Sequence, residues 1–236
     1  MVKEERRRAA HVLLLDAGNA FSDSRSARGK VIVEAMNLLN YDAMALGDRD
    51  FSLGLEDLRQ RIAEAEFPIL SANAMLTATG ELFAKPYAIK GIGEHKAAII
   101  GLTNPKAALM AGGGSITVLD PFETARRYLA ELGEEADIVI VLSNLGLKED
   151  KRLASEVEGI DLIVGGNSRT VLNPPLRIGP TGTIIVQAGY HGEWVGKVEL
   201  SIDEKGKVTS YKGKTVLLGP DFADDPEMRT LLNASK

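Results

Sequence analysis

The stretch "LIVGGNSRT" (162–170) joins an apolar run to two glycines and then to polar residues. Its first three residues have the composition of a buried strand. Gly165 and Gly166 allow the backbone to turn sharply where that strand would end. The side chains of Asn167 and Arg169 follow the turn. The stretch therefore predicts a strand whose carboxyl end presents polar groups, which is where ligands bind in α/β folds.

Three other predicted strands end in the same way, in "LLLDAGN" (13–19), "AMALGDRD" (43–50) and "IVLSNLG" (140–146). Because the carboxyl ends of parallel strands meet at one edge of a sheet, we expect their polar residues to converge. The candidate cluster consists of Asp16, Asn19, Asp48, Arg49, Asp50, Asn144, Asn167 and Arg169. The alternative interpretation is that these are ordinary loop residues that cap turns.

The rest of the chain alternates between strand and helix patterns until about Thr183, after which strands and turns dominate. Helical periodicity is predicted over 26–40, 53–67 and 120–136, with Asp120 as a cap. A buried strand is predicted over 11–19, and two strands joined by a glycine turn over 87–103. This order predicts a layered α/β domain whose central strands are buried on both faces.

Composition narrows the classes of function. The 236 residues are 44% hydrophobic and carry a formal net charge of −5, which disfavours nucleic-acid binding. Cysteine is absent, which excludes disulfides and zinc thiolates, and no two of His11, His95 and His191 have metal-site spacing. "AGGGS" (111–115) lacks the lysine of a phosphate loop.

The N-terminal region and the apolar runs bear on targeting and on membrane association. The basic cluster formed by Lys3 and the three arginines at 6–8 is interspersed with glutamates and predicts a solvated helix face. No run is long and apolar enough to span a membrane, and the apolar stretch at 12–15 is too short for a signal-peptide core. We therefore expect a cytoplasmic protein without membrane partners.

The four strand ends, in their order, resemble those of the calcineurin-like metallophosphoesterases. The similarity is to the 5′-nucleotidase and UDP-sugar hydrolase branch, whose corresponding segments read like "LLLDAGD", "ALGNHEFDYG", "VLSHLG" and "GGHSHT". It extends from about Val12 to Leu218. The resemblance implies an α/β/β/α sandwich that lacks the family's first strand. It also implies a domain over 1–220, followed over 221–236 by an acidic turn and a linker-like helix.

In that family the motifs hold two metal ions. The resemblance places the family's bridging aspartate at Asn19, its asparagine ligand at Asp48, the catalytic histidine at Arg49, the following glutamate at Asp50, and the later histidines at Asn144, Asn167 and Arg169. An Asp-x-His motif on the first strand has no counterpart. No catalytic set is intact, so no metal cofactor is expected. Of the three histidines, His191 is the candidate to reach the site.

The replacements suggest a different chemistry for the cluster. An arginine cannot coordinate a metal, so Arg49 and Arg169 would put fixed positive charge where the family holds cations. Two guanidinium groups brought together need carboxylates or a bound oxyanion beside them. We therefore expect either an Arg–Asp network with Asp48 and Asp50 or a phosphate-like anion between the arginines.

Three functions remain open. The sequence favours a degenerate metallophosphoesterase, a pseudoenzyme with a binding or assembly role. A first alternative is a 5′-nucleotidase-like hydrolase that works around a single Mg or Mn ion held by Asp48, Asp50 and Asp16. A second is a metal-free module that binds phosphate-like anions. The implied lack of a strand predicts an open sheet edge, covered by a homodimer partner, a separate chain or segment 1–11.

Overall fold

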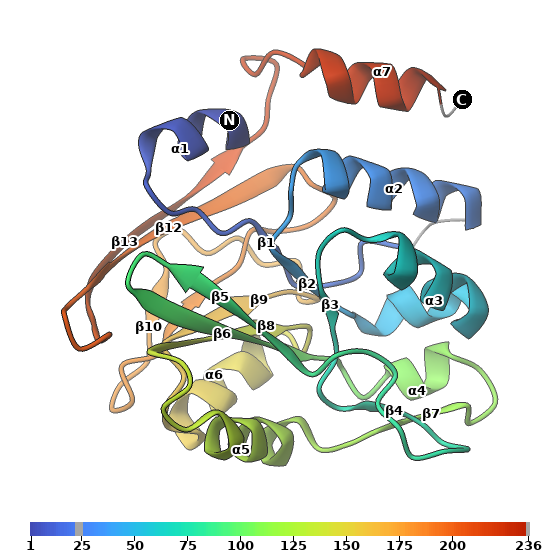
Figure 1. Cartoon of the computed structure of the whole chain (residues 1–236), viewed down its shortest axis with the longest axis horizontal. Helices are drawn as coiled ribbons and strands as arrows, with labels where there is room; N and C mark the ends of the chain where they lie inside the picture. The colour runs from blue at the N-terminus through green and yellow to red at the C-terminus, as the bar shows by residue number, and fades with distance from the viewer. Residues whose placement is uncertain (22–25, 235–236) are drawn as a thin grey trace.

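The computed structural model describes residues 1–21 and 26–234 (Figure 1). Its helices are α1 (Val2–Arg8), α2 (Ser26–Leu38), the 3-10 helix η1 (Asp48–Leu53), α3 (Leu55–Glu64), α4 (Ala107–Met110), α5 (Pro121–Leu132), α6 (Leu147–Glu156) and α7 (Pro226–Ala234). Its strands are β1 (Leu15–Asp16), β2 (Ala43–Ala45), β3 (Ile69–Leu70), β4 (Ala74–Leu76), β5 (Tyr87–Ile92), β6 (His95–Leu102), β7 (Ile116–Val118), β8 (Ile138–Ser143), β9 (Leu162–Gly165), β10 (Leu176–Arg177), β11 (Ile184–Val186), β12 (Trp194–Ile202) and β13 (Val208–Leu217).

Within these described residues, two main sheets face each other. β1, β2 and β3 form a parallel sheet in that order. The second sheet has the order β10-β11-β9-β8-β6-β5, and its strands from β11 to β6 are parallel. β12 and β13 form a long antiparallel hairpin, and β4 pairs with β7. In Figure 1, α1, α2 and α7 lie above the sheets, whereas α5 and α6 lie below them.

Three apolar clusters hold these layers together. Ile99 and Leu162 belong to a cluster that fills the space between the two main sheets. Tyr128 of α5 and Leu153 of α6 pack beneath the second sheet, and Leu58 of α3 packs on the other side of the first. The predicted α/β/β/α sandwich is therefore confirmed.

Local sequence explains why the central elements form. All six residues of β8 are buried, as expected for a parallel strand covered on both faces and rich in β-branched residues. The predicted start of α5 is confirmed, since Asp120 Oδ1 accepts the backbone N–H groups of Phe122 at 2.8 Å and Glu123 at 2.9 Å. Pro121 occupies the first helical position, where its missing N–H costs nothing.

The prediction of a long buried strand over 11–19 is wrong. Only Leu15 and Asp16 are paired as a strand, and both are half-buried. Their pairing is with β2 alone among the described residues, so the other edge of β1 has no strand beside it. This open edge borders a large cavity.

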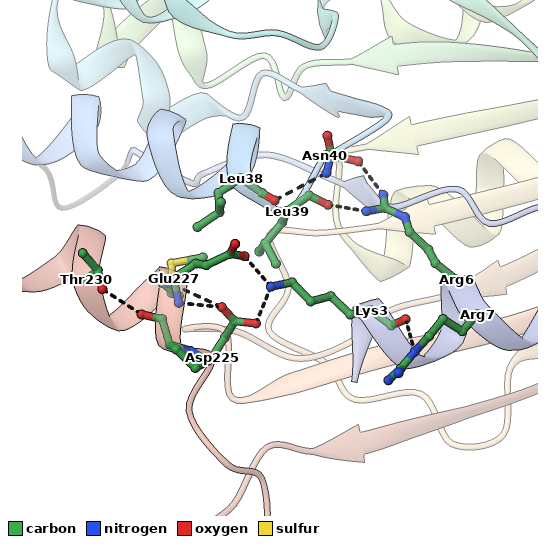
Figure 2. Close-up of polar contacts among 11 residues, drawn as sticks. Lys3, Arg6, Arg7, Leu38, Leu39, Asn40, Asp225, Glu227 and Thr230 are labelled. Carbon is green, nitrogen blue, oxygen red and sulfur yellow. Dashed lines mark hydrogen bonds and ion pairs between the residues drawn. The ribbon is translucent and has the colours of Figure 1, made fainter.

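The N-terminal basic cluster is not wholly solvated, as Figure 2 shows. Lys3 Nζ lies 2.7 Å from Asp225 Oδ2 and 2.6 Å from Glu227 Oε2, which links α1 to the start of α7. The guanidinium of Arg6 donates to the backbone carbonyl of Leu39 at 2.6 Å, just beyond the end of α2. The prediction of a solvated face is therefore wrong for Arg6, which is half-buried.

The C-terminal acidic turn and short helix are present as predicted, with α7 ending at Ala234 and residues 235–236 outside the described part. The division of the chain at residue 220 stays a prediction. No helix in the described ranges has both the length and the apolar character needed to cross a bilayer.

Candidate functional site

The carboxyl ends of β1, β2, β8 and β9 meet where the edges of the two sheets come together. Asn19 Nδ2 donates to Asp48 Oδ1 at 3.1 Å. The backbone N–H of Asp48 donates to Asn144 Oδ1 at 3.1 Å, and Asn167 Nδ2 donates to the backbone carbonyl of Asn144 at 3.0 Å. These bonds connect all four strand ends, so the predicted convergence is confirmed.

The glycines of the opening stretch are required by close packing. A Cβ at Gly166 would lie 2.8 Å from the backbone carbonyl oxygen of Ala17. A Cβ at Gly165 would lie 2.5 Å from Asp150 Oδ2. Both distances are shorter than van der Waals contact, so larger residues would push β9 away from β1 and α6. The glycine turn therefore sets how closely the two sheets approach at the site.

Unusual backbone conformations are concentrated where these four strand ends meet, a region called the cleft. The φ angles of Asn19, Asn167, Arg169 and His191 are 69°, 65°, 57° and 58°. Asparagine tolerates this left-handed region and histidine is also found there, whereas arginine is strained. A strained residue such as Arg169 is typical of sites where the direction of the side chain matters more than backbone stability.

Asp50 lies beneath the cleft rather than in it. Its carboxylate accepts the backbone N–H groups of Gly47, Asn19 and Phe21, each at 2.8 Å. The side chain is fully buried, and burial raises the pKa of Asp50 to about 7 although these three donors lower it. Asp50 thus holds the β1 and β2 turns together, a role that sequence analysis missed.

The side chain of Asp16 caps the turn that follows β1, as the alternative interpretation of the sequence predicted. Its Oδ1 accepts the backbone N–H of Gly18 at 2.8 Å. Desolvation raises the pKa of Asp16 to about 6. Asp48 Oδ1 accepts from Asn19 and from the backbone N–H of Arg49 at 3.0 Å, and the described residues hold no group of three carboxylates that could hold an ion.

The predicted Arg–Asp network is wrong. Arg49 and Arg169 are exposed and line the same cavity, but within the described residues neither guanidinium is ion-paired with a carboxylate. The physical reason is that Asp48 and Asp50 turn their carboxylates towards N–H donors of the strand-end turns. Arg169 instead lies over the ring of Tyr190, 5.3 Å from its centroid.

Tyr190 is a cleft residue that sequence analysis missed. Its ring centroid lies 4.6 Å from that of His191, and both residues line the cavity with the two arginines. The signal in the sequence is an aromatic residue inside the glycine-rich turn "AGYHGEW" (188–194). His191 lines the cavity beside the two arginines. His11 lines the same cavity, with its ring beside Gly93, and His95 lies outside it, next to Asp137.

The residues present do not fit a two-metal centre. Both polar atoms of the Asn144 side chain are already hydrogen-bonded within the protein. Its Oδ1 accepts from the backbone N–H of Asp48, and its Nδ2 donates to the Ala17 carbonyl at 2.8 Å. The same is true of Asn19, because its Oδ1 accepts the backbone N–H of Arg49 at 2.9 Å. In the described ranges, no three His, Cys, Asp or Glu side chains are grouped as metal ligands.

No protein-family model matches the chain. The chain is 33% identical over 260 residues to 5′-nucleotidase from Bos taurus, an alignment that covers 98% of this chain and 45% of that protein. It is 31% identical over 277 residues to the trifunctional nucleotide phosphoesterase protein YfkN of Bacillus subtilis, covering 100% of this chain and 19% of that protein. The chain thus spans about half the length of the 5′-nucleotidase it matches.

A solved structure agrees with these relatives. The 5′-nucleotidase precursor from Thermus thermophilus matches with a TM-score of 0.88 and 31% identity, over 99% of this chain and 51% of that chain. The resemblance drawn from the four strand ends is therefore confirmed for both sequence and fold.

Proposed function

Because the chain is a homologue of the 5′-nucleotidases and has the metallophosphoesterase fold, we propose that it is a hydrolytically inactive domain whose cleft binds a phosphate-like anion. The observation that carries this proposal is the bonding of the cleft amides. Asn19 directs its side chain at the end of β2, and Asn144 directs its side chain at the ends of β1 and β2, rather than at a shared ion. Such a network stabilises the ends of the strands without any metal.

The anion part of the proposal rests on the two arginines. Arg49 and Arg169 face one cavity, and in the described structure neither has a carboxylate partner. A guanidinium group binds phosphate oxygens through parallel N–H donors, and its charge does not titrate away at neutral pH. Tyr190, under Arg169, limits the directions in which that guanidinium can point. An oxyanion between the arginines would offset their mutual repulsion.

The test is titration with inorganic phosphate, followed by calorimetry or by NMR of the arginine side chains. We expect Arg169→Ala to weaken phosphate binding by about fivefold or more, as loss of a charge-assisted contact should. Arg127→Ala is the matched control, because Arg127 also stacks on a tyrosine, at 5.0 Å from the Tyr128 centroid, but lies outside the cleft. Absent binding, or equal loss in the two variants, would overturn the anion site.

A hydrolase that uses one hard cation is the second candidate, favoured by the names of the relatives as nucleotidase and phosphoesterase. Against it stands the burial of Asp50, whose carboxylate is occupied by three backbone donors. Metal analysis of the purified chain, combined with assays on AMP and on a generic phosphodiester, separates the candidates. We expect no stoichiometric metal and no turnover. Turnover that requires bound Mg or Mn and is lost in Asp48→Asn would establish the hydrolase instead.

A further inference from the structure

A small polar pocket lies at the end of the second sheet that is opposite the cleft. It is lined by Asp161, immediately before β9, by Ile184 at the start of β11 and by Val208 at the start of β13. β9 and β11 run parallel, and the cleft lies beyond the carboxyl end of β9. The pocket thus lies at the amino ends of both strands, and none of its lining residues borders the large cavity.

The size of the pocket limits what it can hold. Its volume is about 90 Å³. Water takes up roughly 30 Å³ per molecule in the liquid, so this space corresponds to about three water molecules. Its walls include the apolar residues Ile160, Ile184 and Val208. Pockets for drug-sized ligands begin at roughly 300 Å³, so the occupant here is restricted to a few non-hydrogen atoms.

Arg177 provides a positive charge at this pocket. It is the second residue of β10 and is exposed, and its guanidinium has no ion pair or hydrogen bond within the described residues. A Cβ at Gly182 would lie 3.4 Å from Nη2 of Arg177, so the guanidinium lies against this turn. The φ of Gly182 is 80°, which glycine adopts without strain. The glycine turn therefore leaves the room that the guanidinium occupies at the pocket wall.

Asp161 provides a negative charge at the same pocket. Its Oδ2 accepts the backbone N–H of Val139 at 2.8 Å. Among the described residues its Oδ1 has no hydrogen-bond partner, and neither oxygen is paired with a cation. Burial raises the pKa of the Asp161 carboxyl, although the Val139 N–H lowers it. The charge of Asp161 is therefore only partly compensated, and a further donor at Oδ1 would stabilise it.

The hydroxyl groups of the lining differ in whether they are already bonded. Those of Thr181, Thr209 and Ser210 donate to atoms of residues that do not line the pocket. The hydroxyl of Tyr211 has no hydrogen-bond partner in the described part of the chain. It is therefore available to a ligand, together with the two charged groups.

Arg177 and Asp161 line the same narrow space without pairing with each other. A simple anion on Arg177 would be repelled by the Asp161 carboxylate, and a simple cation on Asp161 would be repelled by the guanidinium. A molecule that carries one charge of each sign avoids both repulsions. Taking its two charges out of water is offset only when each has a partner, and the pocket offers one for each.

We propose that this pocket binds a small zwitterionic α-amino acid about the size of alanine, with its carboxylate on Arg177 and its ammonium group on Asp161. The planar guanidinium donates two parallel hydrogen bonds to a carboxylate. An ammonium group has three donors, for which Asp161 Oδ1 and the Tyr211 hydroxyl are acceptors. A methyl side chain fits the apolar walls, whereas the volume excludes the larger amino acids. This pocket is independent of the arginines in the cleft.

The test compares L-alanine with two analogues that each lack one charge, on the unchanged protein. L-lactate has a hydroxyl in place of the ammonium group, and L-alaninamide has an amide in place of the carboxylate. We expect alanine to bind saturably and each analogue to bind about tenfold more weakly or worse, because each loses a charge-assisted contact. Two-dimensional NMR should show shifted backbone amides at 160–162, 177–184 and 208–211.

Two variants assign the two charges. Asp161→Asn keeps the acceptor for the Val139 N–H and should abolish the preference for alanine over lactate. Arg177→Gln should abolish the preference for alanine over alaninamide. The first control is Asp137→Asn, which also alters an aspartate that accepts a backbone N–H at 2.8 Å. The second is Arg126→Gln, which alters an exposed arginine outside the pocket. Both controls should keep both preferences.

If a variant does not fold, the ligand series on the unchanged protein still decides the question. The amino-acid site would be overturned by the absence of saturable binding, or by shifts confined to other segments. It would also be overturned if acetate or inorganic phosphate bound at these segments as tightly as alanine, or if both preferences survived in Asp161→Asn and Arg177→Gln.

Discussion

The backbone N–H of Asp48 donates to the side-chain Oδ1 of Asn144 at 3.1 Å, across 96 positions of sequence. This bond joins the end of β2 in one sheet to the end of β8 in the other. The same amide donates from Nδ2 to the Ala17 carbonyl, beyond β1. Asn144 is fully buried, so a single side chain with one acceptor and one donor ties three strand ends together.

Asn144→Asp should destabilise the fold by about 1–3 kcal/mol, because a carboxylate accepts from Asp48 but cannot donate to Ala17. The new carboxylate would also be buried without a compensating donor. Urea unfolding followed by circular dichroism measures the change. Asn40→Asp is the control, since Asn40 is exposed and its φ of 53° is also tolerated by aspartate. Equal stability of the two variants would show that the Ala17 bond contributes little.

Gly166→Ala should destabilise the protein by about 1–3 kcal/mol, because its Cβ would be forced against the Ala17 carbonyl oxygen at 2.8 Å. The neighbouring atoms are the backbone carbonyl and the Cβ of Ala17, which cannot rotate out of the way. Gly91→Ala is the control, because a Cβ there has no neighbour within 4 Å and the residue lies in β5. Thermal unfolding of the two variants should separate them. A Gly166→Ala protein as stable as Gly91→Ala would mean that the sheets can move apart without cost.

The sequence was sufficient to predict features of the structure that depend on neighbouring residues along the chain. The Asp120 cap and the convergence of Asn19 with Asn144 follow from local pattern and from one rule about strand ends. It was not sufficient for side-chain direction, since nothing local indicates that Asp50 points at backbone N–H groups rather than at Arg49. The resemblance to the family implied the open edge of β1, but the cavity beside that edge depends on which strands pair across the chain, a long-range property of the fold.

Stability should depend on pH through Asp150. Ser143 Oγ donates to its Oδ1, its Oδ2 has no hydrogen-bond partner, and burial raises the pKa of Asp150 to about 7. A carboxyl group with a raised pKa keeps its proton in the folded state while the unfolded chain loses it. The free energy of unfolding contributed by this group is therefore present below about pH 4 and is lost as pH rises towards about 7.

The comparison that isolates this effect is Asp150→Asn, which keeps the acceptor for Ser143 but cannot ionise. Between about pH 5 and pH 8 the unchanged protein should lose on the order of 2 kcal/mol more stability than the variant. Urea unfolding at several pH values measures both slopes. Parallel slopes for the two proteins would show that Asp150 ionises in the folded state as easily as in the unfolded chain.

Arg169 combines a strained backbone with a side chain aimed into the cleft, and two substitutions separate these properties. Its φ of 57° is costly for arginine and for alanine, whereas glycine adopts it freely. Arg169→Gly and Arg169→Ala both remove the guanidinium and its contact with Tyr190. We expect the glycine variant to be the more stable of the two by about 1 kcal/mol, because only it relieves the strain.

Both variants should weaken phosphate binding equally, since neither retains the charge of Arg169. Urea unfolding and phosphate titration on the same preparations give the two readouts. An alanine variant at least as stable as the glycine variant would refute the strain, and undiminished phosphate binding in both would refute the role of the guanidinium.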